Sequence, residues 1–332
     1  MRAMGIERHG DASELRLLNI EQPVPSSHQV LVRVVCSSVN PADIRARAPS
    51  AQRVIPRTFP LVLGYDVSGV VESVGDRVRG FTVGDAVFGS PALTGQGANA
   101  EYVVVDYRSL CHKPAGWSHA QAAALSLAGA TALECLERGA ACGARRSVLV
   151  HTGAGGVGHL QIQLARALGW RVWATAGNQE SMALCHRLGA ERVINYREED
   201  FVAVCLAEAG HHGMPTIMDN VGGEVFSRSI EALSPLGTLV SIVPSPHPAY
   251  GGLFAKAATL IYHVMGAASL WGVDPAAQGQ ALSRLVDIAL EYGIAPTISH
   301  RWKVRDLAQA HRQIETGRTI GKVVVDVEDG WS

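Results

Sequence analysis

The sequence predicts an α/β protein organised around a doubly wound parallel sheet, and three observations support this prediction. An apolar run, Val148–Val150, leads into glycines at the G-x-G-x-x-G spacing, Gly153, Gly155 and Gly158, and apolar residues then recur at helical spacing. Strand and helix patterns alternate regularly after this loop. The segment before it holds short β-type runs divided by glycine and proline. Together these observations predict a parallel sheet joined to a strand-rich region.

The first part of the chain, to about residue 120, is expected to form a compact strand-rich domain. Its β-type runs are Val30–Val35, Val67–Val74, Ala86–Phe88 and Tyr102–Val105. Two polar stretches, Ser37–Asp43 and Gly64–Gly69, stand at strand–turn junctions where they would line a cleft. Turn chemistry alone also accounts for both stretches, and the residues by themselves favour that interpretation. Small residues in Ala120–Arg138 then predict a helix that bridges to the next domain.

The loop at residues 152–158 has the chemistry of a pyrophosphate site. One glycine allows the tight turn, the next lets the backbone approach a phosphate, and the third permits close helix–strand packing. Free N–H groups and the helix dipole then face the ligand. We therefore expect a dinucleotide here.

The strands expected after this loop are Arg171–Ala176, Arg192–Ile194, Thr216–Asp219 and Thr238–Val243. Asn178 is predicted to be a helix N-cap and Gly189 the residue that ends the same helix. The carboxyl ends of such strands ring a ligand crevice. The most apolar run, Ala257–Val273, is too short to span a bilayer and is interpreted as a buried strand with flanks. Helical patterns from Asp274 and from about Asp306 precede a last strand, Lys322–Val327, which needs a partner sheet, and the strand-rich domain has one.

Composition limits the function classes. The chain has 332 residues, 29 basic and 30 acidic side chains and a net charge of −1, without the basic excess that a nucleic-acid binder needs. Six scattered cysteines and an N-terminus without a signal-peptide core lead us to expect a cytoplasmic protein with no membrane segment. The His211-His212 pair is interpreted as solvated rather than metal-binding.

Several stretches together resemble the medium-chain dehydrogenase/reductase superfamily and, within it, the zinc-free quinone oxidoreductases. They are Val30–Val34 with Asn40–Asp43, Leu63–Val70, Val83–Gly89, the loop at 152–158, Val193–Asp200 and Thr319–Val324. The resemblance implies a Rossmann dinucleotide-binding domain inserted in a β-rich GroES-like catalytic domain. We place the catalytic domain at residues 1–122 and 274–332 and the dinucleotide-binding domain at 123–273.

The resemblance also implies NADPH-dependent reduction of a quinone or activated enone, usually in a homodimer. Zinc-dependent relatives carry Cys, His and Cys ligands where this chain has Asn40, Tyr65 and, more approximately, Leu127, so no metal site is expected. The proposed catalytic residues are Asn40 and Tyr65, as hydrogen-bond donors to the oxygen that gains charge. Asp43 is expected to shape the turn. The expected cofactor-binding residues are Thr131, Thr152, Gly153, Gly155, Gly156, Val157, Gly177, Tyr196, Arg197, Asn220 and Val243.

A preference for NADPH over NADH is expected, because no acidic residue stands in Ala174–Asn178, where an NAD-selective fold accepts the ribose hydroxyl. Tyr196 and Arg197 offer a hydroxyl and a guanidinium to a 2′-phosphate, whereas Glu180 and Ser181 weaken the preference. Two alternatives stay open. One is a reductase of the C=C bond in 2-enoyl thioesters or haloacrylates, and the other is a non-catalytic NADPH-binding protein.

Overall fold

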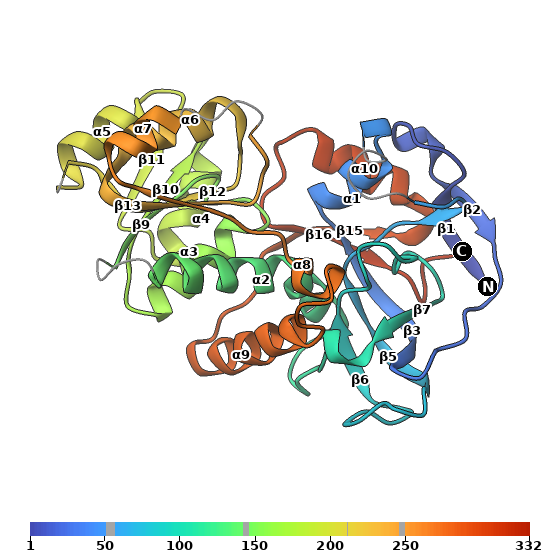
Figure 1. Cartoon of the computed structure of the whole chain (residues 1–332). Helices are drawn as coiled ribbons and strands as arrows, with labels where there is room; N and C mark the ends of the chain where they lie inside the picture. The colour runs from blue at the N-terminus through green and yellow to red at the C-terminus, as the bar shows by residue number, and fades with distance from the viewer. Residues whose placement is uncertain (51–56, 142–145, 211, 246–249) are drawn as a thin grey trace. The chain divides into compact units, whose positions relative to one another are not determined.

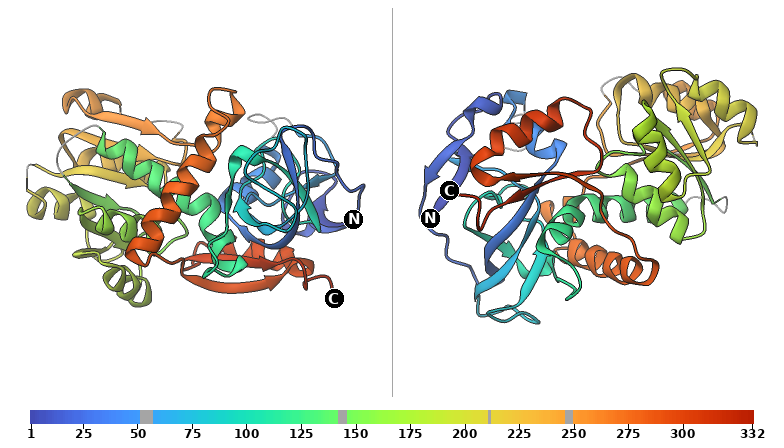
Figure 2. Two further views of the ribbon diagram at one scale, coloured as in Figure 1. Left: turned by 90° about the horizontal axis from the view of Figure 1, so that it is seen from below. Right: turned by 180° about the vertical axis from the view of Figure 1, so that it is seen from behind.

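The computed structural model describes residues 1–50, 57–141, 146–210, 212–245 and 250–332 (Figures 1 and 2). These residues form two compact units. Unit 1 comprises Met1–Ala130, Met265–Val286 and Pro296–Ser332, and unit 2 comprises Thr131–Val264 and Asp287–Ala295. The divisions at 130/131 and 286/287 fall inside two helices, α2 (His119–Ala140) and α9 (Ala277–Tyr292). The functional boundaries at 122/123 and 273/274 stay a prediction.

Unit 2 contains a parallel sheet with the strand order β11-β10-β9-β12-β13-β14 among the described residues. The chain enters at the centre, runs outward to one edge, and returns to the centre to build the other half, which is the doubly wound arrangement. The strands are β9 (Ser147–Val150), β10 (Arg171–Ala176), β11 (Arg192–Asn195), β12 (Met214–Asp219), β13 (Leu233–Ser241) and β14 (Thr259–Tyr262).

Helices cover both faces of this sheet (Figure 1). They are α3 (Gly158–Ala167), α4 (Gln179–Leu188), α5 (Phe201–Glu208), α6 (Gly223–Ala232) and α7 (Tyr250–Ala255). The predicted caps of α4 are confirmed: Asn178 Oδ1 accepts a hydrogen bond from the Ser181 N–H at 2.9 Å, and Gly189 ends the helix with a φ of 108°. Local chemistry therefore sets the length of the βαβ crossover.

The strand expected within Ala257–Val273 is present as β14 (Thr259–Tyr262), but the prediction that it is buried was wrong. Among the described strands β14 pairs with β13 alone, and it lies at the edge of the sheet. Its side chains are half-buried or exposed, and Tyr262 and Val264 are exposed. A run of apolar residues is typical of a central parallel strand, but it does not distinguish the centre of a sheet from an uncovered edge.

Unit 1 is strand-rich and takes its strands from both ends of the chain. A sheet with the order β15-β16-β3-β5-β6-β8, with β7 also on β3, lies beside a smaller sheet with the order β2-β1-β4. The strands are β1 (Arg2–Ile6), β2 (Arg16–Asn19), β3 (Gln29–Val39), β4 (Leu61–Val62), β5 (Val67–Val74), β6 (Ala86–Gly89), β7 (Tyr102–Asp106), β8 (Leu110–His112), β15 (Ile298–Lys303) and β16 (Lys322–Asp326). The other helices are α1 (Pro41–Arg47), α8 (Ala267–Leu270) and α10 (Leu307–Glu315).

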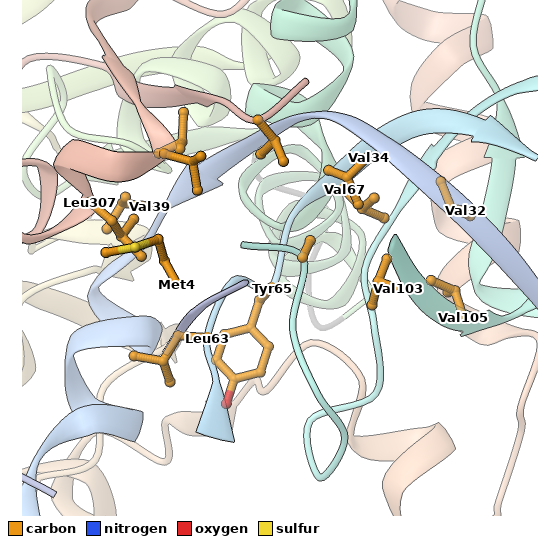
Figure 3. Close-up of a cluster of buried hydrophobic side chains, with 14 of the residues drawn as sticks. Met4, Val32, Val34, Val39, Leu63, Tyr65, Val67, Val103, Val105 and Leu307 are labelled. Atoms are coloured by element: carbon orange, nitrogen blue, oxygen red, sulfur yellow. The ribbon is translucent and has the colours of Figure 1, made fainter. Parts of the chain in front are cut away.

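The last strand joins the front sheet as predicted. β16 pairs antiparallel with β3, with Val323 opposite Val39 and Asp326 opposite Cys36. Valines of β3, β5, β7 and β16 fill the core of unit 1 together with Met4, Leu63 and Leu307 (Figure 3). No helix in the described ranges is long and apolar enough to cross a bilayer.

Three buried histidines make the stability of the fold sensitive to acid. Burial lowers the pKa of His151 to about 4, against the attraction of Asp219. Burial and the charge of Arg138 lower the pKa of His263 to about 4, and burial with Arg47 lowers that of His311 to about 3. Each ring is therefore neutral in the folded protein where the unfolded chain already binds a proton.

We expect the free energy of unfolding to fall as the pH drops below the ordinary histidine value of 6.5 toward 4. In that window the unfolded state binds more protons than the folded state, so stability increases with pH. For His263→Leu, the loss between pH 7 and pH 5 should be smaller by on the order of 2 kcal/mol. Urea unfolding at both pH values measures this, with exposed His186→Leu as the control. An equal loss in wild type and His263→Leu would contradict the assignment.

Candidate functional site

The two polar turns of unit 1 are held together by one carboxylate. Asn40 ends β3 and precedes α1, and its N–H donates to Asp43 Oδ2 at 2.8 Å. The N–H groups of Gly64 and Tyr65 donate to Asp43 Oδ1 at 3.0 and 3.1 Å. Burial raises the pKa of Asp43 to about 7, and the hydrogen bond from Asn40 opposes this rise. The predicted role of Asp43 in shaping the turn is confirmed, and it brings the backbones of Asn40 and Tyr65 to one place.

A buried polar cluster lies beneath these turns and comprises Ser38, Asn40, Asp66 and Lys322, here called the Asp66 cluster. Asp66 Oδ2 accepts hydrogen bonds from Ser38 Oγ, from Asn40 Nδ2 at 2.7 Å and from Lys322 Nζ at 3.3 Å. Its other oxygen accepts from the N–H of Leu127 at 2.7 Å. Lys322 and Asp66 are 2% and 0% exposed, so this ion pair is fully removed from water.

The cluster determines how the Asn40 amide is oriented. Lys322 Nζ donates to Asn40 Oδ1, while Asn40 Nδ2 donates to Asp66. The reverse orientation would place an N–H₂ against an ammonium and an oxygen against a carboxylate. The amide is therefore fixed, and its second hydrogen has no partner among the described residues.

Tyr65 presents a hydroxyl that keeps its proton. The ring lies beside Leu63 and its oxygen points away from Val67 (Figure 3). Arg57 donates to this oxygen, and its guanidinium carbon lies 5.7 Å from the ring centroid. Burial raises the pKa of Tyr65 to about 12, against the charge of Arg57. At neutral pH the phenol is a hydrogen-bond donor rather than a phenolate.

The residues at the zinc-ligand positions of related dehydrogenases do not fit a zinc ion. Asn40 already bonds an ammonium, Tyr65 is protonated, and Leu127 has no side-chain donor. A zinc ion bound by Asn40 would lie beside the buried positive charge of Lys322. In the described part of the chain, no group of three or more His, Cys, Asp or Glu side chains is placed to hold a metal.

The glycine loop of unit 2 fits a phosphate-bearing ligand. The N-terminus of α3 has Val157 as N-cap and no capping side chain, whereas the neighbouring α4 and α5 are capped by Asn178 and Asp200. Within the described residues, the N–H groups of Gly156 and Val157 have no hydrogen-bond partner. Unpaired donors at a helix N-terminus are the groups that bind phosphate.

The loop itself is rigidly held. The Gly153 N–H donates to the Thr175 carbonyl at 2.9 Å, and the Gly155 N–H to the Thr152 carbonyl at 2.8 Å. A Cβ at Gly158 would lie 2.2 Å from that Thr152 carbonyl oxygen, which explains a glycine there. Thr152 adopts a φ of 51°, which is unfavourable for a β-branched residue, and its hydroxyl donates to the His151 carbonyl at 2.7 Å.

The expected 2′-phosphate residues are together at the ends of β10 and β11. The Tyr196 N–H donates to the Ala176 carbonyl at 3.1 Å, and a Cβ at Gly177 would come within 2.4 Å of the Tyr196 hydroxyl oxygen. Arg197 is exposed and makes no ion pair with a described residue. The Tyr196 hydroxyl therefore lies against Gly177, and Arg197 follows it in the chain.

The remaining predicted cofactor residues differ in their surroundings. Asn220 Nδ2 donates to the His151 carbonyl at 2.9 Å, which places Asn220 against the glycine loop. Val243 lies just past the end of β13, not within the predicted strand, and packs against Gly222. Thr131 is buried on α2, and no hydrogen bond joins its side chain to the loop within the described residues.

Sequence reasoning missed the partners that support this half of the site. Lys322 lies in Thr319–Val324, one of the stretches that carry the family resemblance, but it was assigned no role from the sequence. Its pairing with Asp66 spans 256 positions of the chain. Arg57 was not singled out either. A lysine at the start of a strand indicates a buried ion pair only once its carboxylate partner is known.

Removal of Lys322 should strongly destabilise the protein, because it leaves the Asp66 carboxylate buried without its counter-charge. We expect Lys322→Met to lower the free energy of unfolding by about 3–5 kcal/mol. The double variant Lys322→Met/Asp66→Asn should recover a substantial part, since the unpaired charge is gone. Chemical denaturation of both variants measures this coupling, and additive losses would show that the pair is not coupled.

Comparison with known proteins agrees with this geometry. The chain matches the alcohol dehydrogenase GroES-like domain over residues 26–115 and the zinc-binding dehydrogenase family over residues 188–325. It is 32% identical to quinone oxidoreductase of Mus musculus and 30% identical to that of Rattus norvegicus, each over 98% of this chain and 97% of the relative.

Solved structures show the same fold. Quinone oxidoreductase of Coxiella burnetii is 31% identical with a TM-score of 0.84, and each chain is covered over 99% of its length. A mycobacterial protein solved in complex with NADPH is 28% identical with a TM-score of 0.87, over 98% of this chain and 99% of that one. The expected parallel sheet and GroES-like sheet are thereby confirmed. This chain belongs to the quinone oxidoreductase branch of the medium-chain dehydrogenase/reductase superfamily.

Proposed function

We propose that this oxidoreductase uses NADPH to reduce a quinone or an activated enone without zinc. The observation that carries the proposal is the donor set of unit 1, in which a protonated Tyr65 hydroxyl and a fixed Asn40 amide stand where a metal would require ligands. The cofactor, when bound, supplies a hydride. With one further proton, this reduces the quinone by two electrons to the hydroquinone.

The residues of the chain contribute binding, orientation and stabilisation of charge. Gly156 and Val157 offer their free N–H groups to the pyrophosphate. Tyr65 donates a hydrogen bond to the substrate oxygen that becomes negative, and the second Asn40 hydrogen is available for the same purpose. Thr131, Asn220 and Val243 are proposed to contact the nicotinamide half. This use of the residues follows from their chemistry and from the family.

The NADPH preference is supported by the adjacent Gly177, Tyr196 and Arg197, and by the lack of an acid in Ala174–Asn178. A guanidinium favours a 2′-phosphate over a hydroxyl, because it forms paired charge-assisted hydrogen bonds. Glu180 in the first turn of α4 works against a large preference.

The cofactor assignment predicts two different losses of affinity. Gly155→Val should weaken NADPH and NADH alike, since its side chain blocks close approach of the pyrophosphate. Arg197→Ala should weaken NADPH by about tenfold and leave NADH nearly unchanged. Fluorescence titration with both nucleotides measures this, with Gly251→Val as the control, because a Cβ at Gly251 meets no atom of a described residue within 4 Å. A lower Kd of the wild type for NADH than for NADPH would rule out the preference.

Turnover should depend on Asn40 and Tyr65 and not on zinc. We expect Tyr65→Phe and Asn40→Ala to lower kcat/KM for 1,4-benzoquinone by about tenfold or more while the Kd for NADPH stays constant. Dialysis against a chelator should leave the rate unchanged. Stoichiometric zinc whose removal abolishes activity would overturn the mechanism, and unchanged kinetics in both variants would return the two residues to a purely structural role.

We also propose a homodimer formed through unit 2. β14 leaves one edge of the parallel sheet without a partner strand in the described structure, and Phe254, Tyr262 and Val264 expose apolar surface on unit 2. An uncovered apolar edge favours pairing with a second copy. Sedimentation velocity should show a dimer that Val264→Lys weakens and Val24→Lys, an exposed change on unit 1, does not. A monomeric wild type would exclude the dimer.

A cytoplasmic location is proposed from the cysteines. Cys36, Cys135, Cys185 and Cys205 are free thiols in the described residues. Burial raises the pKa of Cys185 and Cys205 to about 12, which keeps them protonated. Free cysteines of this kind are typical of proteins in a reducing compartment such as the cytoplasm. Cell fractionation with an antibody to the chain would locate it.

A further inference from the structure

The oxygen of the Tyr65 hydroxyl accepts a hydrogen bond from a cation. Arg57 Nη2 is the donor, and the guanidinium carbon of Arg57 lies 5.7 Å from the centroid of the Tyr65 ring. Within the described residues the Arg57 side chain makes no other hydrogen bond and no ion pair, and its Nε is buried without a partner. The residues outside the described ranges contain no aspartate or glutamate. The Tyr65 phenol is therefore the main polar contact of this guanidinium.

This hydrogen bond sets the direction of the phenol proton. A phenol hydroxyl has one proton to donate, whereas a guanidinium has donors and no acceptor. The Tyr65 proton therefore points away from Arg57. The Tyr65 hydroxyl makes no second hydrogen bond with a described residue. It thus presents its proton to a ligand rather than to the protein.

The charge of Arg57 also makes this phenol a stronger donor. Burial raises the pKa of Tyr65 to about 12, and the charge of buried Asp43 adds to that rise. Arg57 opposes the rise through its charge and its hydrogen bond, and Arg45 opposes it more weakly through its charge. A hydroxyl that accepts from a cation is polarised, so its own O–H group donates more strongly. Such a donor stabilises negative charge that develops on an oxygen beside it.

We propose that Arg57 is a positioning residue for the reduction, which directs the Tyr65 proton toward the acceptor oxygen and strengthens it as a donor to the charge that develops there. The inference rests on the proposed function and adds a residue that acts through Tyr65. A neutral quinone benefits from this contact, because hydride transfer leaves its oxygen negative. Arg57 keeps its proton throughout, and no bond to it forms or breaks. If the contact only held the chain in place, the acidity of Tyr65 would not depend on the charge of Arg57.

Kinetics with 1,4-benzoquinone in single and double variants test this role. We expect Arg57→Gln to lower kcat/KM by about tenfold while the Kd for NADPH stays constant, since glutamine can donate to the phenol but carries no charge. Arg57→Lys should restore part of the rate. Arg77→Gln, an exposed change after β5, should keep all of it. In a Tyr65→Phe protein, Arg57→Gln should cost no further rate, because the hydroxyl through which Arg57 acts is already gone.

The outcomes separate this inference from the proposed function. An unchanged rate in Arg57→Gln, or the same loss from Arg57→Gln with and without the Tyr65 hydroxyl, overturns the role of Arg57 and leaves the proposed function standing. A rate in Arg57→Lys no higher than in Arg57→Gln also overturns it.

If the wild type reduces neither 1,4-benzoquinone nor an enone, the proposed function fails, and the acidity of the phenol decides the role of Arg57. Difluorotyrosine in place of Tyr65 is a stronger acid and gives a fluorine NMR signal that reports its own titration. We expect its pKa to be higher in Arg57→Gln, corresponding to an acid about tenfold weaker, because a nearby positive charge is lost. Asp43 and Arg45 are the same in both proteins, so the difference reports Arg57. An equal pKa in the two proteins rejects the inference.

Discussion

The substrate half of this protein depends on a single buried ion pair. Lys322 begins the last strand, β16, and its ammonium reaches both Asn40 and Asp66 beneath the two turns that present Asn40 and Tyr65. Two charges removed from water stabilise a fold only when their remaining hydrogen-bonding capacity is satisfied. Here Ser38, Asn40 and the Leu127 N–H complete the shell of Asp66. The pair thereby fixes the orientation of the Asn40 amide, which the proposed zinc-free mechanism uses as a hydrogen-bond donor.

The glycine-loop half follows the opposite principle, because the groups proposed to bind the cofactor are N–H groups that the fold leaves unpaired. Asn178 and Asp200 cap α4 and α5, yet the helix after the glycine loop has no side-chain cap. The loop hydrogen bonds to Thr175 hold this uncapped terminus in place and maintain the unfavourable φ of Thr152. One half is therefore preorganised by the hydrogen bonds around the buried Asp66 carboxylate, and the other by leaving a few N–H groups unpaired.

Local signals predicted the elements that carry them. β5 at Val67–Val74 and β10 at Arg171–Ala176 begin and end where their β-branched patterns do, and Asn178 and Gly189 bound α4. The edge position of β14 was missed because burial depends on which strand pairs next, which hydropathy along one segment does not report. The Lys322–Asp66 contact was missed for the same reason at longer range. Likewise, the role of Asp43 in the turn could be predicted from the local sequence. The contact between Arg57 and Tyr65 could not, because it depends on how the chain folds.

Unit 1 takes residues from both ends of the chain, and Arg2 stacks over Trp331 at 5.1 Å. During synthesis the chain emerges from its N-terminus, so Thr131–Val264 of the sheet unit leaves the ribosome well before Lys322. A nascent chain can thus complete the nucleotide loop while Asp66 still waits for its counter-charge. The Asp66 cluster therefore forms only after Lys322 has emerged, and a product truncated before β16 would lack the lysine that pairs with Asp66.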